Sequence, residues 1–339
     1  MHSLTPIRIG TCSWADEALS KYFYPPKLPA KERLAYYAEF FDTVEVDSTY
    51  YRLPGESMVQ GWADRTPDGF TMHVKAFGLM TRHPVKIEVI PEDLRDAMPI
   101  DERGRVDRPP RELRGEVFRR FLEALEPLRS TGKLGGILFQ LPPYIVYKDH
   151  SLDYLTWAKE QLGGDEMLVE FRHRSWLDDE NRAATLSFLE DLGATYVTVD
   201  APKSDTARNP VPTVPAVTSA TSYVRFHARN LGTGNKRGGA WAARQNSFVT
   251  SPRLLAAGSV RWDVMPSNPS LWPSASSARA AMSTVTALIS PPSTPILGNH
   301  GGSPLRNGWT GVKAWEGPCI RAPHPGPRRH RPLPPRAHG

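Results

Sequence analysis

Five charged residues stand within or just after short apolar runs, where charged side chains are uncommon. They are Glu45, Lys75, Glu170, Arg172 and Arg225. Charged groups are almost never fully buried without a partner, so these five should pair with one another or with a ligand. Two interpretations therefore stay open. One is a closed network of ion pairs within the protein, and the other is a pocket for a polar, anionic molecule.

The basic members of this group are suited to anion binding. Arg172 and Arg225 each carry a planar guanidinium that can hold a carboxylate or a phosphate through two hydrogen bonds. Lys75 would add a point charge to the same anion. We expect these three residues to form an anion clamp.

The acidic members could transfer protons. Glu45 and Glu170 come from well-separated apolar runs and could stand on opposite sides of a bound molecule as general acid and base. His227 and His173 titrate near neutral pH, and we rank His227 first, although a lone histidine in such a position is often structural. Asp200 completes the candidate catalytic set, which is Glu45, Glu170, His227 and Asp200.

Other polar and aromatic residues could orient a substrate. Gln140, in the sequence QLPP, offers an amide donor and acceptor. Trp14, Tyr50 and Trp176 could stack on a sugar or a base, although aromatic residues in such positions also serve as packing. The candidate substrate-binding residues are Trp14, Thr49, Tyr50, Lys75, Gln140, Arg172, His173, Trp176, Arg225, Arg229 and Asn230.

A metal centre is the main alternative within the enzyme class. Glu45, Glu170, Asp200, His173 and His227 carry oxygen and nitrogen ligands of the kind that barrel hydrolases and isomerases use. However, the sequence contains no HxH or HExxH pair, and the neighbouring arginine and lysine would repel a divalent cation. We expect no metal. We also expect no nucleotide cofactor, because no GxGxxG or GxxxxGK[ST] pattern occurs.

Short apolar runs alternate with helical periodicity up to about residue 230, which is typical of βα units in a parallel sheet. Strands are predicted at residues 7–10, 43–47, 70–75, 134–141, 167–171, 195–200 and 223–227. Helices are predicted at residues 30–41, 115–130, 151–162 and 180–193. Residues 80–112 read as an excursion over the mouth of a barrel. In a parallel barrel the C-terminal ends of the strands meet at one mouth, which would collect the candidate residues.

Several blocks in the same order carry a resemblance to a known family. They are GTCSWAD, FYPPKLPAKERLAYYAEFFDTVEVDSTYYRLP, TPDGFTMHVKA, LGGILFQLPP, VEFRHRSW, VTVDAP and YVRFHARN. Over residues 7–230 the chain resembles the DUF72, or YecE-like, family. The resemblance implies a TIM (β/α)-barrel and an uncharacterised function. Ala228 stands where the family has glycine, Gly234 stands near an expected tryptophan, and the paired asparagines of the last strand are missing. We therefore expect seven recognisable strands, with the eighth missing or replaced and two strand edges open.

The charge changes sign along the chain. Residues 1–200 hold 33 acidic and 25 basic side chains, whereas residues 201–339 hold 3 acidic and 17 basic ones. We predict a barrel domain over residues 1–235 and a Pro/Arg/Ser-rich, mostly disordered tail over residues 236–339. The tail reads like a GC-rich gene translated out of frame, and a native tail that binds RNA or membranes is the alternative. The acidic balance of residues 1–200 disfavours binding along a nucleic-acid backbone.

These observations favour one function and leave two others open. No run of eighteen apolar residues and no signal peptide occur, so we expect a cytoplasmic protein without a membrane partner. The favoured function is an acid/base hydrolase, lyase or isomerase that acts on a small, anionic, sugar-like or nucleotide-like molecule. The alternatives are a non-catalytic protein that binds an anion or a nucleic-acid end, and a metal-dependent hydrolase or isomerase.

Overall fold

The computed structural model describes residues 7–200, 211–226 and 247–250. All seven predicted strands are confirmed to within about two residues at each end. An eighth strand follows in the described part of the chain. The strands are β1 (Arg8–Thr11), β2 (Thr43–Val46), β3 (Thr71–Lys75), β4 (Leu134–Gln140), β5 (Met167–Glu170), β6 (Thr195–Asp200), β7 (Tyr223–Phe226) and β8 (Ser247–Thr250).

The strands form one curled sheet in the order β1-β8-β7-β6-β5-β4-β3-β2. The strands from β2 to β7 pair in parallel, while β8 lies antiparallel between β7 and β1. An isolated parallel bridge joins Cys12, just after β1, to Glu45 on β2. The eighth position of the sheet is thus filled by a strand of opposite direction, and the predicted open edges next to β7 and β1 are not found.

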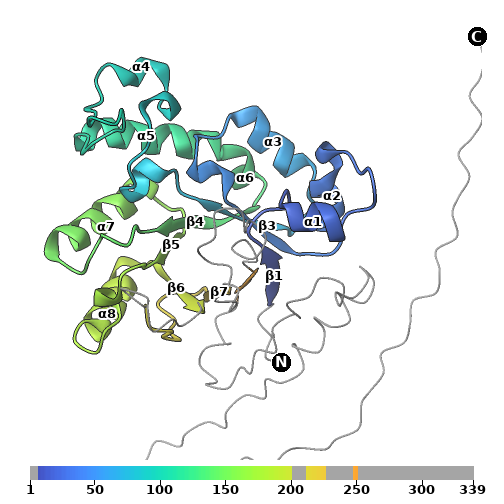
Figure 1. Cartoon of the computed structure of the whole chain (residues 1–339). Coiled ribbons are helices and arrows are strands. Elements are labelled where there is room, and N and C mark those ends of the chain that lie inside the picture. The colour runs from blue at the N-terminus through green and yellow to red at the C-terminus, as the bar shows by residue number, and fades with distance from the viewer. Residues whose placement is uncertain (1–6, 201–210, 227–246, 251–339) are drawn as a thin grey trace, which may run out of the picture. The chain divides into compact units, whose positions relative to one another are not determined.

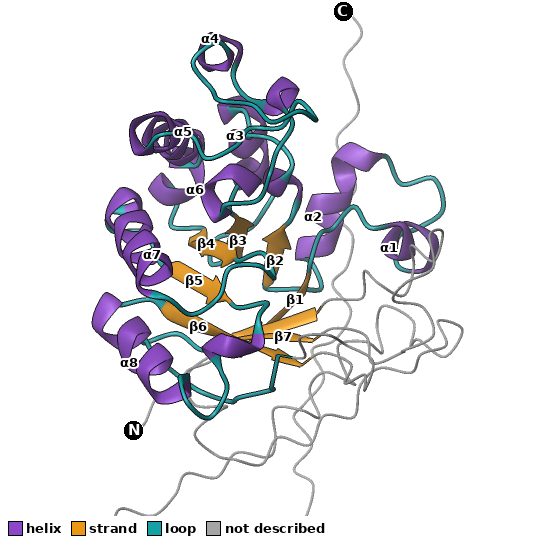
Figure 2. Ribbon diagram, turned by 60° about the vertical axis from the view of Figure 1, so that its left-hand side comes forward, coloured by secondary structure: helices purple, strands orange, loops and turns teal. Residues whose placement is uncertain are grey.

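Helices α5 (Arg111–Ala124), α6 (Glu126–Ser130), α7 (Asp149–Leu162) and α8 (Arg182–Leu192) lie along the outer side of the sheet (Figures 1 and 2). Pro127 lies in the first turn of α6, where a proline is tolerated, and a single predicted helix is therefore divided into α5 and α6. Helix α2 (Arg33–Ala38) follows the short 3-10 helix η1 (Ala30–Glu32). The short helices α1 (Glu17–Tyr22) and α3 (Glu56–Asp64) were not predicted.

Residues 80–112 form the predicted excursion between β3 and α5. They contain the 3-10 helix η4 (Ile87–Val89), the helix α4 (Glu92–Arg95) and two isolated bridges, but no named strand. The excursion begins at the 3-10 helix η3 (Gly78–Thr81), directly after β3. It therefore places extra residues at the C-terminal end of the third strand.

Apolar side chains gather in two separate clusters. The larger one holds the residues between sheet and helices, such as Leu34, Phe118 and Trp176. The smaller one consists of Leu138, Leu168, Val197, Val199 and Tyr223, all from β4 to β7. Because strand side chains alternate between faces, the smaller cluster marks the concave face of the curled sheet.

Gly10 permits the close approach of β1 to β2. A Cβ atom at this position would lie 2.1 Å from the backbone oxygen of Thr43. Gly10→Ala should therefore lower the free energy of unfolding by about 1–3 kcal/mol, because the clash is with backbone and cannot be relieved by a rotamer change. Chemical denaturation measures the loss. Gly164→Ala is the matched control, since a Cβ there meets nothing within 4 Å, and its effect should stay within about 0.5 kcal/mol. Equal effects of the two changes would contradict this assignment.

Candidate functional site

A buried guanidinium lies at the centre of the concave face. Arg225 on β7 is 2% exposed, and its Nε and Nη2 lie 3.0 and 2.9 Å from the two carboxylate oxygens of Glu45 on β2. Its Nη1 donates to Glu170 on β5, and Nη2 also lies 3.4 Å from the Sγ of Cys12. Burial alone lowers the pKa of Arg225, but Glu170 and Glu45 outweigh it and raise the pKa well above its usual value. The residue is a permanent cation held by two carboxylates.

Glu170 links this network to the ends of the strands. Gln140 at the end of β4 donates its amide to Glu170 over 3.0 Å. Arg172, two residues beyond Glu170, forms an ion pair with it through Nε and is about one-third exposed. Since Nε of Arg172 makes no hydrogen bond of good geometry, the contact is a charge pair alone. Within the described residues, Arg172 forms no ion pair with a carboxylate other than that of Glu170.

This arrangement changes the roles expected for three residues. Every nitrogen of Arg225 contacts another side chain, so the geometry does not support Arg225 as part of an anion clamp. Glu45 and Glu170 are both 0% exposed and are bridged by one guanidinium. A substrate cannot lie between two carboxylates that bind the same arginine. Their expected role as acid and base on opposite sides of a ligand is therefore not supported.

Two other groups beside Arg225 remain protonated. Burial raises the pKa of the Cys12 thiol well above its usual value, and the carboxylate of Glu45 raises it further. Burial and Glu45 also raise the pKa of Tyr223, whose hydroxyl donates to Glu45 over 3.0 Å. At neutral pH neither group is an activated nucleophile.

A second set of side chains lies near the C-terminal ends of β2, β3 and β5, and we call it the mouth group: Asp47, Tyr50, Lys75, His83 and Arg172. The Lys75 ammonium lies 4.7 Å from the centre of the Tyr50 ring. The His83 ring meets the same ring edge to face at 5.1 Å. Burial, followed by the charges of Lys75 and Arg172, lowers the pKa of His83 to about 4. His83 is therefore neutral at pH 7 and lies within electrostatic reach of both cations.

The other predicted residues have structural roles or lie outside the described part. Thr49 is buried and donates to the Lys75 carbonyl oxygen over 2.6 Å. Trp176 is 0% exposed, stacks on Phe171 at 4.3 Å and donates to the Ile145 carbonyl oxygen, so it is a core residue and not a wall of the pocket. His173 accepts from the Ser175 amide through Nδ1 and caps the 3-10 helix η5 (Arg174–Trp176). Trp14 packs on Trp62, and Asp200 ends β6. His227, Arg229 and Asn230 lie outside the described residues.

Comparison with known proteins identifies the family. The family model described as "Protein of unknown function DUF72" matches residues 8–257. The chain belongs to the DUF72 family. It is 32% identical to the UPF0759 protein YunF of Bacillus subtilis over 225 residues, which are 66% of this chain and 71% of that protein.

Two solved DUF72 proteins share the fold. One, from Enterococcus faecalis V583, is 24% identical, with a TM-score of 0.54 over 70% of this chain and 79% of that one. The other, from Thermotoga maritima MSB8, is 28% identical, with a TM-score of 0.51 over 68% of this chain and 77% of that one. The family match extends beyond residue 235, the predicted end of the barrel domain, and that boundary stays a prediction.

Sequence reasoning assigned no role to two members of the mouth group in this DUF72 chain. Asp47 directly follows β2, and its position after TVEV was a usable signal. His83 belongs to the excursion after β3 and gave no such signal. Burial raises the pKa of Asp47, and the nearby Glu45 adds to that effect.

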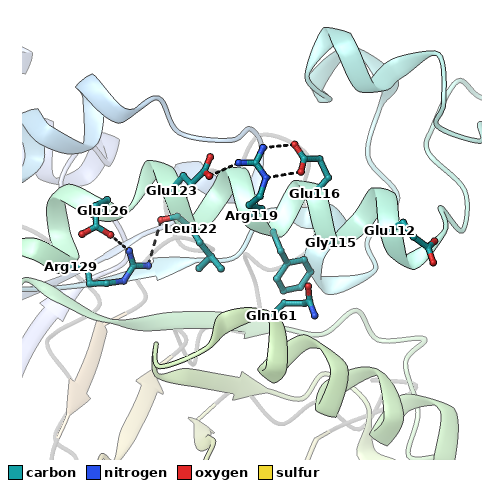
Figure 3. Close-up of a pocket in the computed structure, with 10 residues that line it drawn as sticks. Glu112, Gly115, Glu116, Arg119, Leu122, Glu123, Glu126, Arg129 and Gln161 are labelled. Carbon is teal, nitrogen blue, oxygen red and sulfur yellow. Dashed lines mark hydrogen bonds and ion pairs between the residues drawn. The ribbon is translucent and has the colours of Figure 1, made fainter.

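A hollow of about 520 Å³ lies between α5 and α7 on the outer surface of the DUF72 fold (Figure 3). Four glutamates and two arginines line it, and both arginines are paired with carboxylates. Arg119 pairs with Glu116 and Glu123, and Arg129 pairs with Glu126 and Asp165. Exposed pairs of this kind contribute about 0–1 kcal/mol each. Neither Arg225 nor any residue of the mouth group lines this hollow.

The described part of the chain holds neither a cluster of metal ligands nor a helix that could span a membrane. Within these ranges no three His, Cys, Asp or Glu side chains gather closely enough to hold a metal ion. None of the helices described is both long and apolar enough to cross a bilayer.

Proposed function

We propose that the protein binds a small polar anion at the C-terminal ends of β2 to β5, with Lys75 and Arg172 as the cationic groups. The observation that carries the proposal is the position of the Lys75 ammonium. It is largely buried against Tyr50, yet it forms no ion pair within the described residues. A cation in such a place is stabilised when an anion enters the site.

A second buried lysine shows what a structural role looks like in the same chain. Lys133 is 5% exposed, and its ammonium donates to the carbonyl oxygens of Ala63 and Thr66 over 2.6 Å each. These carbonyls lie at the C-terminal end of α3, where a positive charge is favourable. Lys75 has no such acceptors among the described residues, which supports a ligand as its partner.

The two carboxylates of the buried network do not require Lys75 as a counter-charge, although Asp47 lies within electrostatic reach of Lys75. Glu45 and Glu170 are matched by Arg225 and Arg172, so Lys75 is not needed to neutralise them. The chain offers few other partners, because the only acidic side chains outside the described residues are Asp205, Asp263 and Glu316. Tyr50 and His83 would line the site as neutral walls.

A second candidate function, acid/base catalysis on the bound anion, is favoured by one observation. Burial and Glu45 raise the pKa of Asp47, while burial and Arg225 lower the pKa of Lys75. Groups shifted toward neutrality are suited to proton transfer, and these two follow or end neighbouring strands. The anion found on the purified protein by native mass spectrometry is the test substrate. Loss of turnover in Asp47→Asn with retained binding would support catalysis, and absence of turnover in the wild type would leave a binding protein.

The affinity for the anion should depend on pH. The pKa of Lys75 is lowered by burial, so its charge is lost at a lower pH than that of an exposed lysine. Affinity should therefore be full below this lowered pKa and should fall as the pH rises through it. Calorimetric titration with phosphate from pH 7 to pH 10.5 measures the fall. A constant affinity up to the usual lysine pKa, about 10.4, would contradict the assignment.

We also infer that the curled sheet is a (β/α)-type barrel with one antiparallel strand. The bridge between Cys12 and Glu45 and the separate apolar cluster on the concave face both support closure. We further propose that the barrel domain spans residues 1–235, that residues 236–339 form a separate tail, and that the protein is cytoplasmic.

A further inference from the structure

Three arginines converge on two aromatic rings beside the excursion after β3. The guanidinium groups of Arg82 and Arg114 lie 5.2 and 5.3 Å from the centre of the Tyr154 ring. That of Arg111 lies 5.6 Å from the Trp157 ring. The residues come from the C-terminal end of η3, the first turn of α5 and the helix α7. We call these three arginines the arginine cluster.

The arginine cluster has no acidic partner in the described part of the chain. None of its members forms an ion pair there, and Nε of Arg114 is buried without a hydrogen-bond partner. The next arginines on the same helix behave differently. Arg119 and Arg120 both pair with Glu116, and Arg120 also pairs with Asp93. The absence of ion pairs is therefore specific to the cluster, although Glu112 lies between Arg111 and Arg114 in the first turn of α5.

The position of the cluster on α5 is unfavourable without an anion. Arg111 and Arg114 occupy the first turn of a 14-residue helix, where the helix dipole disfavours positive charge. No side chain caps this end of the helix. Stacking on aromatic rings contributes about 0.5–1 kcal/mol for each exposed cation. Burial lowers the pKa of Arg82, and the nearby charge of Arg114 lowers it further.

We propose that Arg82, Arg111 and Arg114 form a second anion site, which binds a phosphate group. Guanidinium groups hold phosphate oxygens through paired hydrogen bonds, and the free amide groups at the start of α5 would add donors. The site adjoins the mouth group through the chain, because Arg82 immediately precedes His83. The Tyr144 hydroxyl fixes this segment by donating to the Arg82 carbonyl oxygen over 2.8 Å.

The test is calorimetric titration of the full chain with pyrophosphate. The double variant Arg111→Gln/Arg114→Gln should weaken binding at one site by about tenfold or more, as expected for the loss of charged hydrogen bonds. The double variant Arg119→Gln/Arg120→Gln removes the same charge from the same helix. It should change the affinity less than twofold. Equal losses in the two double variants, or no loss in the first, would overturn the proposal.

Two further variants keep the result unambiguous. Arg111 is exposed, so Arg111→Gln alone should leave the melting temperature unchanged and still weaken pyrophosphate binding. An unchanged affinity in this folded variant would also count against the site. Lys75→Met should leave binding at the arginine cluster intact, because Lys75 belongs to the mouth group. Failure of the anion site at Lys75 is thereby distinguished from failure of this one.

Discussion

Replacing Arg225 by methionine should lower the free energy of unfolding by about 3–5 kcal/mol. The change removes the guanidinium that contacts both Glu45 and Glu170, each of which is 0% exposed. Two buried carboxylates then repel each other without their shared counter-charge. Chemical denaturation followed by circular dichroism measures the loss.

The cost of leaving two carboxylates unpaired can be separated from the cost of lost packing. A triple variant with Arg225→Met, Glu45→Gln and Glu170→Gln removes all three charges while it keeps similar shapes. It should recover a large part of the stability, because the cost arises from unpaired charge. The exposed control Arg119→Met breaks two surface pairs and should cost less than about 1 kcal/mol. A loss below about 1 kcal/mol in Arg225→Met would mean that the network is not closed as described.

Replacing Lys75 by methionine should weaken anion binding at the mouth group by about 10- to 100-fold. A hydrogen bond to a charged group contributes about 1.5–3 kcal/mol, which corresponds to this range of affinity. The Met side chain keeps the packing against Tyr50 but removes the ammonium. Titration with phosphate at pH 7 gives the affinity of each protein.

The control for this change is Lys31→Met, which removes the same charge from an exposed position on η1. It should leave the affinity within a factor of two. The melting temperature of Lys75→Met should stay equal to or above that of the wild type, because a largely buried cation without an ion-pair partner is costly to keep. An unchanged affinity in Lys75→Met would exclude this residue from the binding site.

The strands and their ends could be predicted because their signal is local. Apolar runs such as TVEV and YVRF give the strands, and the rule that parallel strand ends meet then brings Glu45, Glu170 and Arg225 together. What the rule does not specify is the depth of each side chain within the sheet. Arg225 lies between Glu45 and Glu170, whereas Lys75 lies at the mouth. In the sequence, both are cations within apolar runs.

The remaining features depend on contacts between distant segments. Trp176 looked like an exposed aromatic residue after a strand, but its indole nitrogen reaches the Ile145 carbonyl oxygen and the ring packs on Phe171. His83 enters the mouth group only because the excursion turns back onto Tyr50. The antiparallel direction of β8 is seen in its pairing with β7 and β1, which no local pattern encodes.

Crystals of the full chain soaked in selenate test the central claim most directly, because selenium gives an anomalous signal and selenate resembles phosphate and sulfate. We predict an anomalous peak within hydrogen-bonding distance of the Lys75 ammonium and the Arg172 guanidinium. A map in which a carboxylate of the chain itself forms an ion pair with the Lys75 ammonium, and in which no anomalous peak lies beside that ammonium, would contradict the account.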